Sequence, residues 1–174
     1  MTTQPTNDIN QKRYELMSLW DSTYSVLRKT VDSVKAGQPM RASMLKELVA
    51  FLTLSGDLLG NAWEYERSQP KEAPVSFDIR QKRQQRLELW NDTFEIAKAT
   101  IEAFERGEGT IRGSMLHEIV KLMKLSEHMI LDQEALAKQQ TSMLTEEEER
   151  SLFEDFEKRM AEMGLPTGFE SADG

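Results

Sequence analysis

Residues 8–20 have the sequence DINQKRYELMSLW, and residues 78–90 read DIRQKRQQRLELW. Further identities follow at matching offsets, with one inserted residue in the second copy's turn: Thr23 with Thr93, Thr30 with Thr100, Gly37 with Gly107, Met44 with Met115, and Ser55 with Ser126. Agreement over this length does not arise by chance, so the chain contains two diverged copies of one unit. Repeat arrays usually need three or more units for stability, and two copies fall short of that number.

Each copy has the pattern of two helices around a turn. Apolar residues recur at steps of three and four, which places them on one stripe of a helix. In the first copy the stripe comprises Leu16, Trp20, Leu27, Val31 and Val34, then Leu45, Leu48, Val49, Leu52 and Leu59. Gly37-Gln38-Pro39 and Gly107-Glu108-Gly109 predict the end of the first helix in each copy. The predicted fold class is all-α: two tandem helical hairpins, then a C-terminal amphipathic helix and an acidic tail.

The predicted organisation has five segments. They are a disordered N-terminus at 1–7, a first hairpin at 8–67, a linker at 68–77, a second hairpin at 78–140, and a C-terminal helix with an acidic tail at 141–174. Asp8 and Asp78 are the predicted N-caps of the two copies. Thr145, followed by glutamates, predicts the start of a separate C-terminal helix, so we expect five helices.

The net charge of −8 is not spread evenly along the chain. Residues 132–174 contain twelve acidic and four basic residues, so this segment carries the whole excess and the repeated body is neutral. The overall acidity therefore does not exclude a nucleic-acid partner. There is no cysteine, no apolar run at 1–7 of the kind a signal peptide has, and no apolar stretch as long as a membrane span. These features predict a soluble, cytoplasmic protein.

The residue pattern predicts no enzyme, no cofactor and no metal site. His117 corresponds to Lys46 in the first copy and His128 to Asp57, and positions that accept lysine or aspartate are typical of an exposed surface. Neither a glycine-rich phosphate loop nor a nucleophile elbow occurs in the sequence. The glutamates at 146–149 complement a helix dipole and do not resemble a catalytic pair.

Basic residues gather at the start of each copy. They are Lys12, Arg13, Arg80, Lys82, Arg83 and Arg86. Cations in the first turns of a helix oppose its dipole. One interpretation is a DNA-binding ridge that contacts phosphates and is repeated once per copy; the other is a solvated helix end. Arg41 and Arg112, just ahead of each second helix, are candidates for pairing with a phosphate or a carboxylate.

Aromatic residues lie on the apolar stripe of the first helix in each copy. They are Trp20 and Tyr24 in the first copy, and Trp90 and Phe94 in the second. An aromatic stripe at helical spacing is typical of a core, so we expect these rings to be buried. A packed contact between subunits is the alternative.

One segment of the second copy resembles a known family. Residues 94–104 end a helix, residues 105–110 form a Gly-Glu-containing turn, and residues 115–124 form a Leu-rich helix. This pattern resembles the small terminase subunits, or DNA-packaging proteins, of short-tailed bacteriophages. In those chains a helix ends in a Gly-Glu-x-Thr turn, and a Leu-rich helix closes with a Phe-Leu-Lys-like stretch, for which the first copy has Ala50-Phe51-Leu52. Two features depart from the family: the unit is duplicated, and the first copy has Gln38-Pro39-Met40 in the turn.

The resemblance implies a homo-oligomeric ring that recognises double-stranded viral DNA and presents it to the large, ATP-cleaving terminase subunit in the host cytoplasm. Basic helix starts would face the DNA, and oligomerisation would multiply a weak charge cluster. The C-terminal segment would dock on a partner through Leu152, Phe153, Phe156 and Phe169. The alternative is a helical protein–protein interaction module, such as a phage-encoded inhibitor or scaffold, that does not bind DNA.

Overall fold

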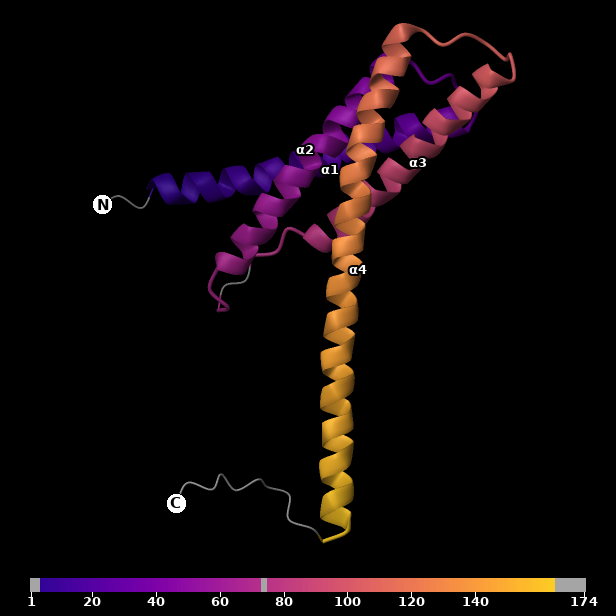
Figure 1. Cartoon of the computed structure of the whole chain (residues 1–174). Coiled ribbons are helices and arrows are strands. Elements are labelled where there is room, and N and C mark those ends of the chain that lie inside the picture. The colour runs from indigo at the N-terminus through magenta and orange to yellow at the C-terminus, as the bar shows by residue number, and fades with distance from the viewer. Residues whose placement is uncertain (1–3, 73–74, 165–174) are drawn as a thin grey trace. The chain divides into compact units, whose positions relative to one another are not determined.

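The computed structural model of the chain describes residues 4–72 and 75–164, and within them all side chains except those at 4–7, 139–147, 149 and 152. This part contains four α-helices and no strand: α1 (Gln4–Lys35), α2 (Ala42–Ser68), α3 (Ile79–Glu105) and α4 (Gly113–Glu162) (Figure 1). The predicted all-α fold class is confirmed. The chain divides into two compact units, Met1–Glu127 and His128–Gly174. Most of the contacts described below lie within the first unit.

Two predicted helix starts are wrong. Helix α1 begins at Gln4, so Asp8 lies inside the helix and part of the segment predicted to be disordered is helical. Pro5 is compatible with this start, because proline is tolerated in the first turn of a helix. Thr145 does not begin a separate helix, because α4 is continuous from Gly113 to Glu162. No glycine or proline interrupts the sequence between residues 113 and 164, so the capping pattern lies within a helix.

The predicted helix ends are confirmed at Gly37 and Gly107. Both glycines have positive φ, at 109° and 77°. Gly37 N–H donates to the Val34 carbonyl and Gln38 N–H to the Ser33 carbonyl, and the equivalent pair of bonds recurs after α3. These bonds form a Schellman motif, which satisfies the last carbonyls of a helix and favours glycine. Asp78 lies at the N-cap position of α3 as predicted, but its side chain makes no capping hydrogen bond.

The same hydrogen bond joins the two helices of each copy. Trp20 Nε1 donates to Ser55 Oγ at 2.8 Å, and Trp90 Nε1 donates to Ser126 Oγ at 2.9 Å. Each serine in turn donates to a backbone carbonyl four residues earlier in its own helix. The equivalence of these bonds shows that the two copies retain the same internal joint. Trp20 is buried, as the aromatic stripe predicted, whereas Tyr24, Trp90 and Phe94 are only half-buried.

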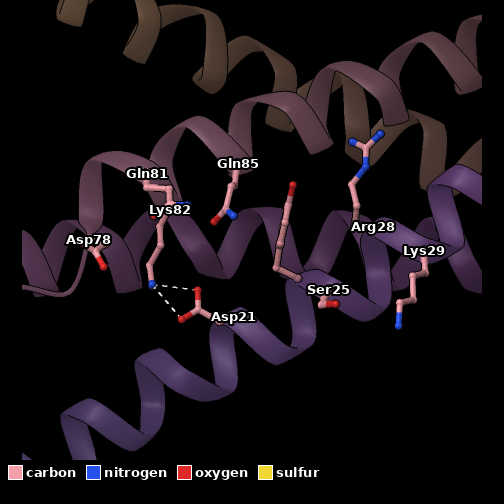
Figure 2. A pocket seen from close by; sticks show the side chains of 9 residues that line it. Asp21, Ser25, Arg28, Lys29, Asp78, Gln81, Lys82 and Gln85 are labelled. Carbon is pink, nitrogen blue, oxygen red and sulfur yellow. Dashed lines mark hydrogen bonds and ion pairs between the residues drawn. The ribbon is translucent and has the colours of Figure 1, made fainter.

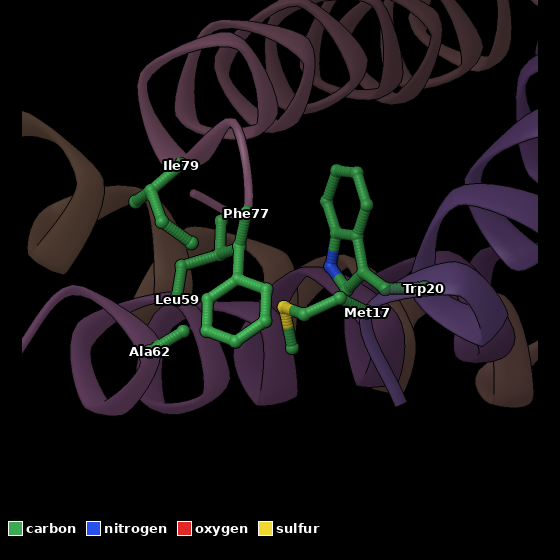
Figure 3. Packing of buried hydrophobic residues seen from close by; sticks show 6 residues of the cluster. All are labelled: Met17, Trp20, Leu59, Ala62, Phe77 and Ile79. Carbon is green, nitrogen blue, oxygen red and sulfur yellow. The ribbon is translucent and has the colours of Figure 1, made fainter. Parts of the chain in front are cut away.

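The second copy packs on the first within one chain. A cluster of buried residues contains Met17, Trp20, Leu59, Ala62, Phe77 and Ile79 (Figure 3). Phe77 precedes α3 and Ile79 begins it, whereas the other four come from α1 and α2. Helix α3 contacts both α1 and α2. We call this contact between α3 and the pair α1–α2 the inter-repeat seam.

We predict that Ser55→Ala destabilises the fold. The substitution leaves the indole N–H of Trp20 buried without its acceptor, which costs about 1–3 kcal/mol of unfolding free energy. Ser33→Ala is the matched control, because Ser33 makes the same kind of bond to the Lys29 carbonyl on an exposed surface, and we expect its effect to stay within about 0.5 kcal/mol. Urea denaturation followed by circular dichroism measures both. Equal effects of the two substitutions would contradict a structural role for the buried bond.

Candidate functional site

The cations predicted to form a DNA-contacting ridge do not all lie at the surface. Lys82 is buried in the inter-repeat seam, with 8% of its side chain exposed. Its Nζ lies 2.9 Å from Asp21 Oδ1 on α1 (Figure 2) and 5.7 Å from the centroid of the Trp20 ring. Because a buried lysine needs a charge partner, Asp21 explains why this cation is tolerated inside. In this packing Lys82 does not present its charge to a phosphate.

Arg86 also makes contacts across the inter-repeat seam. Its Nε donates to the Leu52 carbonyl of α2 at 2.9 Å, and its guanidinium rests against Gly56. A Cβ at Gly56 would lie 2.9 Å from Arg86 Nη2, so the glycine provides the space for this approach. The corresponding residue of the second copy is Glu127, which is exposed. Arg86 and Gly56 therefore form a joint particular to the contact between the copies.

Two further arginines of the predicted ridge, Arg13 and Arg83, stack on aromatic rings. Arg83 lies over Trp63 of α2, with 5.2 Å between Cζ and the ring centroid. Arg13 lies over Tyr65 of α2 at 4.2 Å, and its Nε is buried without a hydrogen-bond partner. Cation–π contacts of this kind contribute about 0.5–2 kcal/mol, depending on how far they are removed from water. They connect α1 and the start of α3 to α2.

Two cations of the predicted ridge are exposed. Lys12 has 74% of its side chain accessible and pairs with Glu15 on the same helix at 2.6 Å. Arg80 lies on the outer side of the first turn of α3. Sequence spacing correctly placed the four cations of the second copy at the start of α3, but Lys12 and Arg13 lie beyond the first two turns of α1, which begins at Gln4. It also did not reveal that four of the six cations face neighbouring helices. The aromatic residues of α2, Trp63 and Tyr65, were the signal that sequence reasoning missed.

A polar groove lies along the seam between α1 and α3 (Figure 2). It is lined by Asp21, Tyr24, Ser25, Arg28, Lys29, Asp78, Gln81, Lys82 and Gln85. Its buried lysine and its half-buried arginine are paired, since Lys82 contacts Asp21 and Arg28 contacts Asp32 and Asp92. Within the described residues, no group of three or more His, Cys, Asp or Glu side chains is arranged to hold a metal ion. The groove joins the two copies through paired charges.

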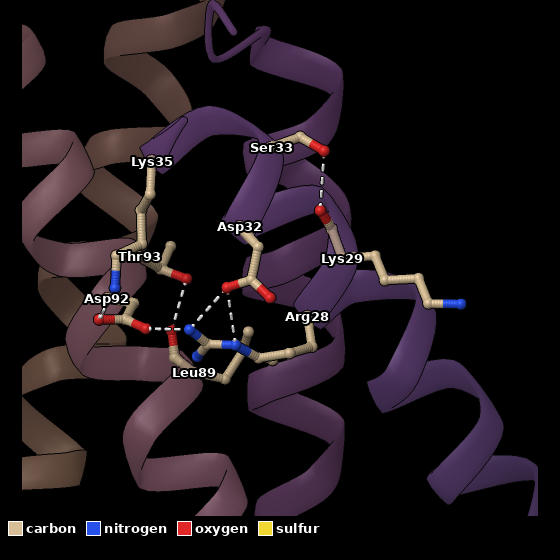
Figure 4. A network of polar contacts seen from close by, with 8 residues as sticks. All are labelled: Arg28, Lys29, Asp32, Ser33, Lys35, Leu89, Asp92 and Thr93. Carbon is tan, nitrogen blue, oxygen red and sulfur yellow. Dashed lines mark hydrogen bonds and ion pairs between the residues drawn. The ribbon is translucent and has the colours of Figure 1, made fainter. Parts of the chain in front are cut away.

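Beyond the groove, an ion-pair network continues the seam toward the end of α1 (Figure 4). Arg28 Nη2 lies 2.6 Å from Asp92 Oδ2 and 2.8 Å from Asp32 Oδ1, and Lys35 Nζ lies 3.2 Å from Asp92 Oδ1. Partial burial alone would raise the pKa of Asp92, but the hydrogen bonds from Arg28 and Lys35 outweigh it and lower that pKa. Asp92 is therefore an anchor of α3 on α1 in its ionised form.

The other predicted site residues have these positions. Arg41 and Arg112 are exposed, and Arg41 is the N-cap residue of α2. His117 and His128 are exposed, as their counterparts in the first copy predicted. Phe153 and Phe156 are exposed on α4 in the second unit. The side chain of Leu152 and the whole of Phe169 lie outside the described residues.

Comparison of the chain with protein-family models, with curated proteins and with solved structures gives no match. The helices of the described part are each too polar or too short to span a membrane.

We predict that the seam weakens in acid through Asp92. A carboxyl whose pKa is lowered by folding stabilises the native state above its unfolded pKa, near 4, and loses that contribution as the pH falls through the folded value. Asp92→Asn should cost about 1 kcal/mol at pH 7. It should also flatten the dependence of unfolding free energy on pH below about pH 4. Urea denaturation of both proteins between pH 2.5 and pH 7, as rough bounds, measures this; parallel pH profiles would exclude Asp92 as the acid-sensitive group.

Proposed function

We propose that this chain is a non-catalytic DNA-packaging factor of the small-terminase kind, a homo-oligomeric adaptor that binds double-stranded viral DNA and presents it to the large terminase subunit. The observation that carries the proposal is the segment at residues 94–124. It resembles that family in sequence, and it folds as a helix, a turn at Gly107 and a second helix that begins at Gly113. Host cytoplasm is the proposed place of action.

The proposed DNA contacts follow the exposure of the cations. Lys12 and Arg80 are exposed at the starts of the two copies, and Arg41 and Arg112 are exposed ahead of the second helices. We assign the phosphate contacts to these four residues, because Lys82, Arg83 and Arg86 are engaged in the seam. Four contacts from one chain give weak binding that salt easily suppresses. Several chains on one DNA would combine these contacts into avid binding.

A second candidate function has its own supporting observation. Phe153 and Phe156 are exposed three residues apart on α4, in a segment where acidic residues predominate. Exposed aromatic residues at this spacing share one face of a helix and are suited to an apolar groove on another protein. The surrounding acidic residues favour a basic partner. In the packaging proposal this partner is the large subunit, and in the alternative it is the target of a protein-interaction module that does not bind DNA.

We predict that the double variant Lys12→Gln/Arg80→Gln binds double-stranded DNA more weakly than the unchanged protein. Each phosphate contact removed should reduce the slope of log affinity against log salt by about 0.9. The matched control is Lys71→Gln/Lys124→Gln, which removes two exposed charges outside the proposed contacts. A gel shift titrated with salt measures both variants.

Equal loss in the control variant would point to net charge as the cause and would remove the assigned contacts. An unchanged protein that gives no shift even at low salt would contradict the packaging function and favour the protein-interaction module.

A further inference from the structure

The repeat makes it possible to compare each surface of one copy with the same surface of the other. Positions in the first helices correspond at an offset of 70 residues, and those in the second helices at an offset of 71. Several apolar positions are buried in one copy and exposed in the other. These differences fall into two groups, one in each copy.

The first group is exposed in the first copy. We call it the leading face: Ile9, Leu19 and Leu54. Its counterparts in the second copy are Ile79, Leu89 and Leu125, and all three are buried. The residue type is the same at each pair of positions, yet Leu19 is 63% exposed and Leu89 is 0% exposed. The needs of the isolated chain do not explain why the same apolar residue is kept at these three exposed positions.

The second group shows the opposite asymmetry. We call it the trailing face: Leu116, Val120 and Met123 on α4, all exposed. Its counterparts on α2 are Leu45, Val49 and Leu52, all of which are buried. Val120 is 63% exposed, whereas Val49 is 6% exposed. The trailing face of the second copy is therefore as apolar as the buried surface of α2 to which it corresponds.

The seam explains both groups at once. Inside the chain, the leading side of the second copy lies on the trailing side of the first: Ile79 packs with Trp20 and Leu59, and Arg86 contacts the Leu52 carbonyl. Ile9 and Leu19 of the leading face correspond to buried residues of α3, and the trailing face corresponds to the buried surface of α2, so both faces are surfaces of the seam kind without an occupant. We propose that a second copy of this chain occupies them, so that the leading face of one molecule packs on the trailing face of the next.

The polar residues around these two faces carry fewer charges than their counterparts in the inter-repeat seam. In the proposed contact, Lys12 of one molecule takes the place of Lys82, and Asn91 of the other molecule takes the place of Asp21. In the same way, Lys98 takes the place of Arg28, and Ser22 takes the place of Asp92. Neither replacement sets like charges against each other, and each leaves one charged residue facing a neutral hydrogen-bonding group. The proposed contact therefore depends on apolar burial, and we expect it to resist salt.

One joint of the seam has no equivalent in the proposed contact. Arg86 corresponds to Leu16, which is exposed, and Gly56 corresponds to Glu127. The close approach that Gly56 permits inside the chain is not reproduced between molecules. We expect the contact between molecules to follow the same surfaces as the seam, with looser packing and reversible association.

The proposed contact joins two different surfaces, so it is heterologous, and it continues from molecule to molecule until a ring closes or a filament grows. Stacking also brings the number of consecutive units to the three or more that repeat arrays need. This inference deepens the homo-oligomeric part of the proposed function by naming the two surfaces that meet, and it does not require that the chain binds DNA.

The test uses one variant for each face. Leu19→Asp blocks the leading face and Val120→Asp blocks the trailing face. Ser18→Asp and His117→Asp are the matched controls, because these neighbouring positions are exposed in both copies. Mass is measured by light scattering after size exclusion, without DNA, at low salt and at high salt.

We expect the unchanged protein and both controls to form particles larger than the 20.0 kDa chain at either salt concentration. Each face variant should be a monomer with unchanged circular dichroism. An equimolar mixture of the two face variants should give a particle of two chains and no larger, because one free leading face meets one free trailing face.

A monomeric unchanged protein would overturn the inference. So would face variants that still assemble, or a mixture that remains monomeric. The result is separable from DNA binding. A chain that assembles but gives no gel shift contradicts the packaging function alone, and a monomer that shifts DNA contradicts the head-to-tail contact and the oligomeric part of the proposed function but leaves DNA binding in place.

Discussion

The fold depends on the packing of α3 against α1 and α2. A pair of helices carries an apolar stripe that it cannot cover by itself, and in this chain the second copy supplies the cover for the first. The contact is reinforced by cations taken from the start of α3, with Lys82 on Asp21 and Arg86 on the Leu52 carbonyl. These charges are stable inside because each has a partner within hydrogen-bonding distance. Because Lys82 and Arg86 are engaged in this contact, other cations of the chain remain available to bind a partner.

Much of the fold could be predicted from the sequence, because the decisive signals are local. Gly37 and Gly107 end helices through a positive φ that glycine adopts readily, and Trp20 lies on a periodic apolar stripe. The start of α1 and the length of α4 were mispredicted for a related reason. A capping residue favours a helix start only when the preceding residues stop the previous helix, and nothing before Thr145 does so.

The candidate site was harder to predict, because periodicity shows which residues of one helix share a face and does not show which neighbour that face meets. Lys12 and Lys82 occupy the same position in the repeat, yet Lys12 is exposed and Lys82 is buried. Leu19 and Leu89 differ in the same way. Identical residues in equivalent positions have different environments because the first copy lacks a predecessor within the chain. Only tertiary packing contains that information.

The divergence between the copies follows from the same asymmetry. Charged pairs that join the copies, such as Lys82 with Asp21, are reduced to one charge at the equivalent outer positions. There Lys12 is the counterpart of Lys82, and the neutral Asn91 is the counterpart of Asp21. The apolar residues at those outer positions are kept. A surface that had only to stay solvated would be expected to lose its apolar residues before its charges, because exposed apolar groups gain nothing from water. The opposite change indicates a surface selected for packing. Packing chains in a series would also repeat the exposed Arg80 once per molecule along one assembly, whereas Lys12 would lie inside each contact. Weak contacts of a single chain with a polyanion would then add up through the association of apolar faces.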